Sequence, residues 1–303
     1  MRVGWKHKGM GFAAALAIAQ PAPAAAQAPA APRPAIWLLE DADTKIYLFG
    51  TIHILPPGFK WRSAALDRVV DGADELVVET YDKAGGDAGE DMWDEAANLF
   101  LAEQPSPILE RVPAEKRDAL RAAIAAGPVP IEGYDMMQTW AAAITLGLST
   151  LLGEYGVADV KDAPGVEDVL EEAFRKAGKP IGSVENPVAV LGAMNALPAA
   201  VQSQLLVETI DTLAKGKQAS DEMDAAWAAG EAERMIVGET DDLPPAIYDV
   251  LIRKRNAAWT LWLADRLERP GKVLFAVGAG HLAGPDSVQK MLAARGLQAR
   301  RID

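Results

Sequence analysis

Two histidines in this chain each follow a glycine by three residues, in Gly50-Thr51-Ile52-His53 and in Gly278-Ala279-Gly280-His281. The only other histidine is His7. Each motif comes directly after a short apolar run typical of a buried strand, and its glycine lets the backbone turn without a Cβ clash. In open α/β sheets, ligands bind beyond the carboxyl ends of the strands. We therefore expect the fold to bring the two turns together around a metal ion.

A carboxylate ends a third apolar run, residues 75–80, where Glu79 follows two valines. Two imidazoles and one carboxylate, with a position left for water, commonly bind catalytic zinc, manganese, cobalt or iron. Such an ion lowers the pKa of its bound water towards about 7 and polarises a carbonyl, so an amide can be hydrolysed without a serine or cysteine nucleophile. Glu79 suits the role of metal ligand and that of general base equally, and the sequence leaves both open.

Other chemistries find little support in the sequence. It contains no G-x-x-x-x-G-K-[ST] phosphate loop, no H-E-x-x-H helix motif and no G-x-S-x-G nucleophile elbow. The absence of cysteine excludes disulfides, thiolate nucleophiles and cysteine zinc sites. A purely structural role, in which the histidines only hold two loops together, stays open.

The N-terminus is typical of an export signal. Residues 1–26 have a basic start, an apolar run over 10–19 and a final triplet of alanines, which predicts a cleaved signal peptide and a periplasmic or secreted protein. An uncleaved anchor is the alternative. No later stretch reaches the roughly 18 apolar residues of a membrane span, so we expect no integral span in the mature chain. Residues 27–35 are predicted to be a Pro/Ala-rich linker, and residues 36–303 one folded domain.

Charge restricts the partners. Removing the three positive charges of residues 1–26 takes the formal net charge from −13 to −16. An acidic surface of this kind argues against nucleic acid as a partner. The size of the remaining chain fits a single domain with a helical insertion. The oligomeric state does not follow from the sequence.

The apolar periodicity predicts an α/β fold of mixed type, with a central mixed sheet, flanking helices and a large helical middle segment. The predicted strands are 36–39 and 45–49, joined as a hairpin, then 75–80, the strand-like piece 179–187, 273–278 and an edge strand over 297–302. The predicted helices are 63–70, with Ser63 as N-cap, then 89–104, 114–126, 135–152, 166–178, 199–215, 221–229, 245–268 and a last helix ending at residue 294.

These motifs resemble those of the TraB/GumN (TraB/PrgY/GumN) family, to which the animal Tiki proteins are similar. The resemblance is carried by the two G-x-x-H motifs, by Val77-Val78-Glu79-Thr80 and by Gly284-Pro285-Asp286 after the second histidine. It extends over about residues 36–302, with further matches at 165–167, 179–181, 184–185, 227–230 and 255–256.

The resemblance implies a fold related to the erythromycin esterase and ChaN-like group. Because Tiki proteins are manganese- or cobalt-dependent metalloproteases, it implies metal-site roles for His53, Glu79 and His281, with manganese or cobalt as the metal and zinc as a further option. Gly50 and Gly278 support the turns, and Glu185, Arg255 and Asn256 match family positions that would orient the ligands or the substrate.

Two functional hypotheses follow. The first is an exported metal-dependent hydrolase, a metallopeptidase acting on a peptide or protein. The alternative is a non-catalytic periplasmic protein that binds a peptide or polysaccharide.

Overall fold

The computed structural model describes residues 31–81, 94–235 and 243–303. The predicted signal peptide and the first residues of the predicted linker lie outside the described residues. From Arg33 onwards the chain is tied to the folded body, because the Arg33 N–H donates to the Ala228 carbonyl at 2.7 Å and Ala35 is buried.

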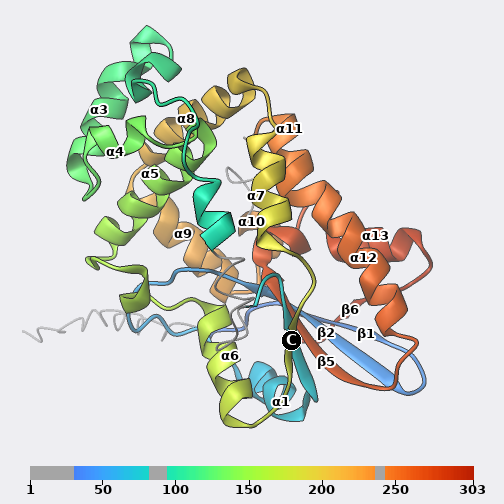
Figure 1. Cartoon of the computed structure of the whole chain (residues 1–303). Coiled ribbons are helices and arrows are strands. Elements are labelled where there is room, and N and C mark those ends of the chain that lie inside the picture. The colour runs from blue at the N-terminus through green and yellow to red at the C-terminus, as the bar shows by residue number, and fades with distance from the viewer. Residues whose placement is uncertain (1–30, 82–93, 236–242) are drawn as a thin grey trace, which may run out of the picture. The chain divides into compact units, whose positions relative to one another are not determined.

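A mixed sheet of six strands lies at the centre of the described chain, as the sequence predicts (Figure 1). Its strand order is β4-β3-β5-β2-β1-β6. The strands β4, β3, β5 and β2 run parallel to one another, whereas β1 and β6 add an antiparallel edge. Their bounds are β1 Ile36–Glu40, β2 Thr44–Thr51, β3 Glu75–Val78, β4 Ile181–Ser183, β5 Gly271–Gly278 and β6 Arg300–Arg301.

Strand β5 is buried on both faces, which explains its continuous apolar run. On one face, Leu274 and Ala276 pack in a core with helices α1 (Ala64–Gly72) and α6 (Val166–Lys176). On the other face, the alternating residues Val273, Phe275 and Val277 pack with α12 (Lys254–Arg266) and α13 (Val288–Ala294). The side chains alternate as the period of two in a strand requires.

The helical middle of the chain has a core of its own. Buried side chains such as Trp140, Leu206 and Ile247 form a cluster separate from the two that cover the sheet. The helices of this segment and its surroundings are α3 Arg117–Ala126, α4 Ile131–Asp135, α5 Thr139–Glu154, α7 Pro187–Asn195, α8 Ala199–Leu213, α9 Lys217–Ala228, α10 Ala232–Met235 and α11 Pro245–Tyr248. A π-helical turn, Asp249–Arg253, joins α11 to α12.

Most predicted elements are confirmed. The hairpin, the strand at 75–80 and the edge strand are present, and the piece at 179–187 returns the chain to the sheet as β4. Ser63 caps α1, because its hydroxyl accepts the Leu66 N–H at 3.2 Å.

Two predicted helices are wrong in part for one shared reason. Residues 89–93 of the helix predicted at 89–104 lie outside the described residues, and among the rest only 94–98 are helical. The helix predicted at 135–152 is broken at 136–138. The backbones of these two breaks pair with each other: Ala102 N–H donates to the Met136 carbonyl at 2.9 Å and Gln138 N–H to the Phe100 carbonyl at 2.7 Å. Tertiary hydrogen bonds therefore replace helical ones, which local periodicity does not reveal.

Helix α7 was not predicted. Its first residue is Pro187. Proline suits this position because the backbone N–H of the first helical residue has no partner within the helix. The Asn186 side chain accepts the Val188 N–H at 2.8 Å and caps the helix. The last residue of the strand-like piece predicted at 179–187 is therefore the first residue of a helix.

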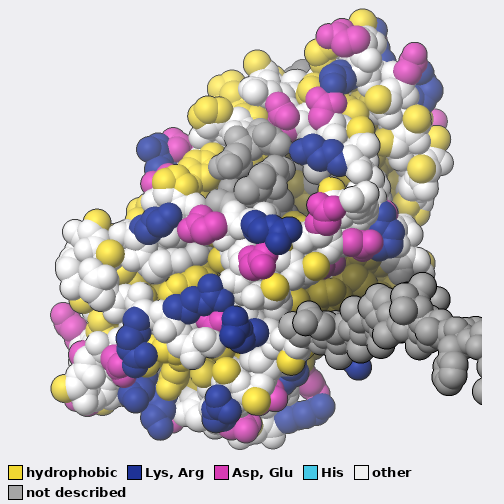
Figure 2. Space-filling model, turned by 180° about the vertical axis from the view of Figure 1, so that it is seen from behind, with side chains coloured by type: hydrophobic (Ala, Val, Ile, Leu, Met, Phe, Trp, Pro, Cys, Tyr) yellow, Lys and Arg dark blue, Asp and Glu magenta, His cyan; other side chains and the backbone are white. Residues whose placement is uncertain are grey.

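Among the described helices, no single one is long and apolar enough to cross a membrane, although α7 and α8 pass that test as a pair bent by 103°. The face in Figure 2 carries Lys and Arg side chains among Asp, Glu and apolar ones. Several charged side chains pair along helices, as Arg175 does with Glu172. Exposed pairs of this kind contribute little to stability.

A buried carboxylate joins α9 to the end of α5. Asp224 is 1% exposed, accepts the Tyr155 hydroxyl at 2.9 Å through Oδ2, and its Oδ1 has no hydrogen-bond partner among the described residues. Burial raises the pKa of Asp224 to about 6. Because the folded state then holds its proton more tightly than the unfolded chain does, this residue should reduce stability as the pH rises from about 4 through about 6.

We therefore expect Asp224→Asn to be stabilised relative to the wild type by on the order of 1–3 kcal/mol more at pH 7.5 than at pH 4.5. Urea unfolding at the two pH values measures the difference. The control Asp118→Asn, at a side chain that is 95% exposed, should leave the pH dependence unchanged. An equal stability difference at both pH values would contradict the account of Asp224.

Candidate functional site

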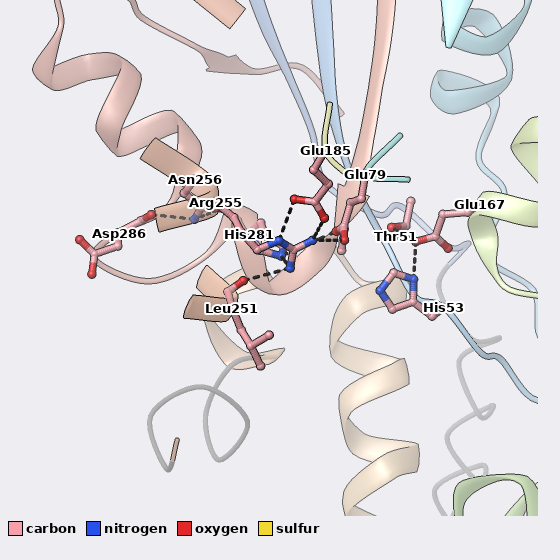
Figure 3. A network of polar contacts seen from close by, with 11 residues as sticks. Thr51, His53, Glu79, Glu167, Glu185, Leu251, Arg255, Asn256, His281 and Asp286 are labelled. Carbon is pink, nitrogen blue, oxygen red and sulfur yellow. Dashed lines mark hydrogen bonds and ion pairs between the residues drawn. The ribbon is translucent and has the colours of Figure 1, made fainter. Parts of the chain in front are cut away.

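The carboxyl ends of four adjacent parallel strands bring the predicted site residues together. In the sheet, Thr51 of β2 pairs with Gly278 of β5, and Val78 of β3 lies opposite Ala276 of β5 and Ser183 of β4. The residues that follow these strand ends are His53, His281, Glu79 and Glu185. Chain segments far apart in the sequence therefore meet at one edge of the sheet, as predicted (Figure 3).

The glycines of both G-x-x-H motifs lie where no side chain fits well. A Cβ on Gly50 would come within 2.9 Å of Ala279, in the turn of the other motif. A Cβ on Gly278 would lie 3.1 Å from Glu79 Oε1, 3.5 Å from the His281 ring and 3.6 Å from His53 Nε2. The space above Gly278 is therefore a cradle on which all three predicted metal-site residues converge.

The ring of His281 is held in one tautomer by Asn256. The Asn256 amide nitrogen donates to the carbonyls of His281, at 3.2 Å, and Asp286, at 2.8 Å. Its Oδ1, 2.6 Å from His281 Nδ1, is then the acceptor, so Nδ1 carries the proton and Nε2 presents a lone pair. The Trp259 ring lies 4.4 Å from the imidazole, and burial lowers the pKa of His281 to about 3. His281 is neutral at physiological pH.

Arg255 connects the carboxylates of the site. Its Nε donates to Glu185 Oε2 at 2.9 Å, and its Nη2 bonds both Glu185 Oε1 and Glu79 Oε2. Its Nη1 lies 3.1 Å from His281 Nε2. In the run Arg253-Lys254-Arg255-Asn256, the first two side chains face solvent, whereas Arg255 and Asn256 belong to the site.

The Glu79 carboxyl is buried beside positive charge. Burial acts to raise its pKa, but the neighbouring His281, Arg255 and His53, together with the Gly278 N–H, which donates to Oε1 at 2.7 Å, act to lower it. The lowering prevails and holds the pKa of Glu79 below its ordinary value, so that the group is ionised at neutral pH. Burial instead raises the pKa of Glu185.

His53 lies on the open side of the site. Its side chain is 67% exposed, against 6% for His281. His53 Nδ1 lies 2.7 Å from Glu167 Oε1, which also accepts the Thr51 hydroxyl. The hydrogen bond to Glu167 and the charge of that carboxylate raise the pKa of His53 to about 9. The contact with Glu167 thus fixes the orientation of the His53 ring through Nδ1, and Nε2 is the ring nitrogen near Gly278.

Glu167 is the site residue that our candidate set lacks. It lies in the first turn of α6, which approaches the first motif closely: Val166 N–H donates to the Ile52 carbonyl at 2.9 Å, and a Cβ on Gly165 would come within 2.2 Å of the His53 carbonyl oxygen. The sequence signal was Gly165-Val166-Glu167, which formed part of the family resemblance. Spacing alone did not connect it to His53, because the two residues lie 114 positions apart in the sequence.

The donor set fits a divalent cation by its chemistry. Two imidazoles and one carboxylate face the Gly278 cradle, and Glu167 and Asn256 hold the Nδ1 atoms, as carboxylates and amides do for metal-binding histidines. As arranged, however, no three His, Asp or Glu side chains of the described residues gather closely enough to hold an ion. The Arg255 guanidinium bonds both Glu79 and His281.

The fold and site define an α/β protein with a His–Glu–Arg site at the carboxyl ends of its parallel strands. The chain belongs to the TraB/PrgY/gumN family, which it matches over residues 35–301. It is 24% identical over 261 residues to the uncharacterized protein YbaP of Escherichia coli (strain K12), an alignment that covers 86% of this chain and 92% of that protein. The family resemblance seen in the sequence is confirmed.

We expect Gly278→Ala to disrupt the site while the fold persists, because the added methyl group lies 3.1 Å from Glu79 Oε1 and close to both histidines. Divalent-metal affinity should fall by about tenfold or more. The matched control is Gly182→Ala in β4, where an added Cβ meets nothing within 4 Å. Calorimetric titration with Mn²⁺ measures both variants, and equal affinity in the two would show that the cradle is not the binding site.

Without residues 1–26 the chain has only two histidines, so their imidazole NMR signals can be followed without crowding. In the metal-free protein we expect Glu167→Gln to lower the pKa of His53 from about 9 towards its ordinary value, because the carboxylate charge is lost. His281 should remain a neutral Nδ1–H tautomer. Glu172→Gln, exposed on the same helix, is the control. A pKa of His53 that does not move would refute the Glu167 assignment.

Proposed function

We propose that this protein is an exported metal-dependent hydrolase that cleaves amide bonds in peptides. The observation that carries the proposal is the convergence of His53, Glu79 and His281 on the Gly278 cradle. Membership of the TraB/PrgY/gumN family, together with the resemblance to the Tiki metalloproteases, supports the proposal.

His53, Glu79 and His281 would hold the ion, with manganese or cobalt expected and zinc as a further option. A divalent cation bound there would acidify a water molecule and polarise the scissile carbonyl. The chain's own contribution is orientation: Asn256 and Glu167 hold the Nδ1 atoms of the two histidines, so Nε2 is the nitrogen that each ring would offer to a cation. Binding then requires that Arg255 release His281 Nε2 and that His53 give up a proton.

The two halves of the site differ in access. His281, Glu79 and Arg255 are mostly buried, whereas His53 faces solvent. A substrate would therefore approach from the His53 side. The buried half provides a fixed, poorly hydrated wall, in which charges interact more strongly than in water.

Activity is tested on protein without residues 1–26, stripped of metal, reloaded with Mn²⁺, Co²⁺ or Zn²⁺ and incubated with a peptide library. We expect cleavage by the reloaded protein, and a loss of at least about 100-fold in His53→Ala and Glu79→Gln, because ligands and general bases contribute this much or more. Lys254→Ala, at an exposed neighbour of Arg255, should retain activity.

Glu79→Gln also separates the two roles of Glu79. Loss of metal affinity would identify a ligand, whereas retained affinity without turnover would identify a general base. If no metal restores cleavage and His53→Ala behaves as the wild type, the hydrolase proposal fails. Peptide or polysaccharide binding that survives Glu79→Gln, with no turnover in either protein, would identify a non-catalytic binding protein instead.

The proposed periplasmic or secreted location is supported by the composition of residues 1–26. We expect the protein expressed with its native N-terminus in a Gram-negative host to be recovered from the periplasm or medium with about 26 residues removed. Mass spectrometry measures the cleavage. A full-length protein confined to the cytoplasm would contradict export.

A further inference from the structure

Arg255 occupies the centre of the proposed metal site. Its guanidinium bonds Glu185 through two nitrogens, Glu79 through Nη2, and approaches His281 Nε2 to 3.1 Å through Nη1. The backbone of the preceding helical turn also holds the guanidinium, since Nη1 donates to the Leu251 carbonyl at 3.0 Å. Its side chain is 14% exposed, and its guanidinium carbon lies 4.8 Å from the centre of the Trp259 ring.

These contacts use the atoms that a cation would need. A neutral imidazole protonated at Nδ1 has a single acceptor, and the acceptor of His281 faces a guanidinium N–H. On Glu79, Oε2 accepts from Arg255 and Oε1 from the Gly278 N–H. A lone pair that accepts a hydrogen bond is not free to coordinate an ion. Of the three proposed ligands, the Nε2 of His53 stands outside this network (Figure 3).

We propose that Arg255 is the resident cation of this site and that a divalent cation binds Glu79 and His281 only by displacing the Arg255 guanidinium from them. The inference rests on the proposed function, because it concerns the same site. Glu185 is the carboxylate suited to retain the guanidinium after displacement, since it binds Nε as well as Nη2. Arg255 is thus a positioning residue that sets the affinity for metal.

The charge balance explains why a resident cation is needed. Glu79 and Glu185 are both mostly buried and bond the same Arg255 nitrogen. A buried carboxylate left without its partner is strongly destabilising. The guanidinium therefore stabilises the metal-free fold and competes with metal at the same time.

The test is calorimetric titration with Mn²⁺ of metal-free protein lacking residues 1–26, together with thermal unfolding with and without Mn²⁺. The variants are Arg255→Gln, which removes the resident charge, and Arg255→Lys, which keeps the charge without the planar fork. Arg253→Gln is the matched control, because it lies on the same helical segment, is 53% exposed and pairs with Asp249.

We expect Arg255→Gln to bind Mn²⁺ at least about tenfold more tightly than the wild type, with Arg255→Lys in between and Arg253→Gln unchanged. Without metal, Arg255→Gln should melt at a lower temperature, and Mn²⁺ should raise its melting temperature by more than in the wild type. Arg255→Lys keeps the test valid if Arg255→Gln does not fold.

The failures are distinguishable. If the wild type binds Mn²⁺ and the Arg255 variants bind it equally or more weakly, the displacement idea is wrong while the proposed function stands. If the wild type and every variant lack Mn²⁺ affinity, the proposed metal site itself is wrong, and the inference falls with it. Binding by Arg255→Gln alone would support displacement in its strongest form.

Discussion

The parallel pairing of β2 with β5 is the constraint on which the site depends. Its register places Thr51 opposite Gly278, so the turns of both G-x-x-H motifs leave the same edge of the sheet. Strand β3 pairs with the other side of β5 and adds Glu79 to that edge. A shift of one residue would turn the side chains of β5 to the opposite faces and separate them from the two cores that they fill. The hydrophobic register thus fixes the geometry of the site.

The second requirement is charge balance at the buried end of the sheet. Two ionisable carboxylates, Glu79 and Glu185, follow adjacent strands and need a cation within reach. Arg255 supplies it from α12, the helix that also provides Asn256, which fixes the His281 tautomer, and Trp259, whose ring lies against the His281 imidazole and the Arg255 guanidinium. One helix therefore determines the protonation and the orientation of the buried half of the site.

The site residues that directly follow predicted strands could be identified from the sequence. Both histidines and Glu79 were identified because they follow apolar runs typical of strands. The periodicity of apolar residues predicted the sheet and most of the helices. Glu167 and the break at 136–138 depend on contacts between distant segments, which periodicity does not encode. Arg255 illustrates the limit: only the family resemblance pointed to it, because its place in the charged run 253–255 suits a solvated face as well as a site.

The most direct test of the central claim is a crystal of the protein lacking residues 1–26 soaked in Mn²⁺ and measured at a wavelength where manganese scatters anomalously. The account predicts one strong anomalous peak beside Gly278, with His53 Nε2, His281 Nε2 and a Glu79 oxygen at about 2 Å from it. A peak bound by other residues, or two imidazoles that stay apart with no peak between them, would contradict it.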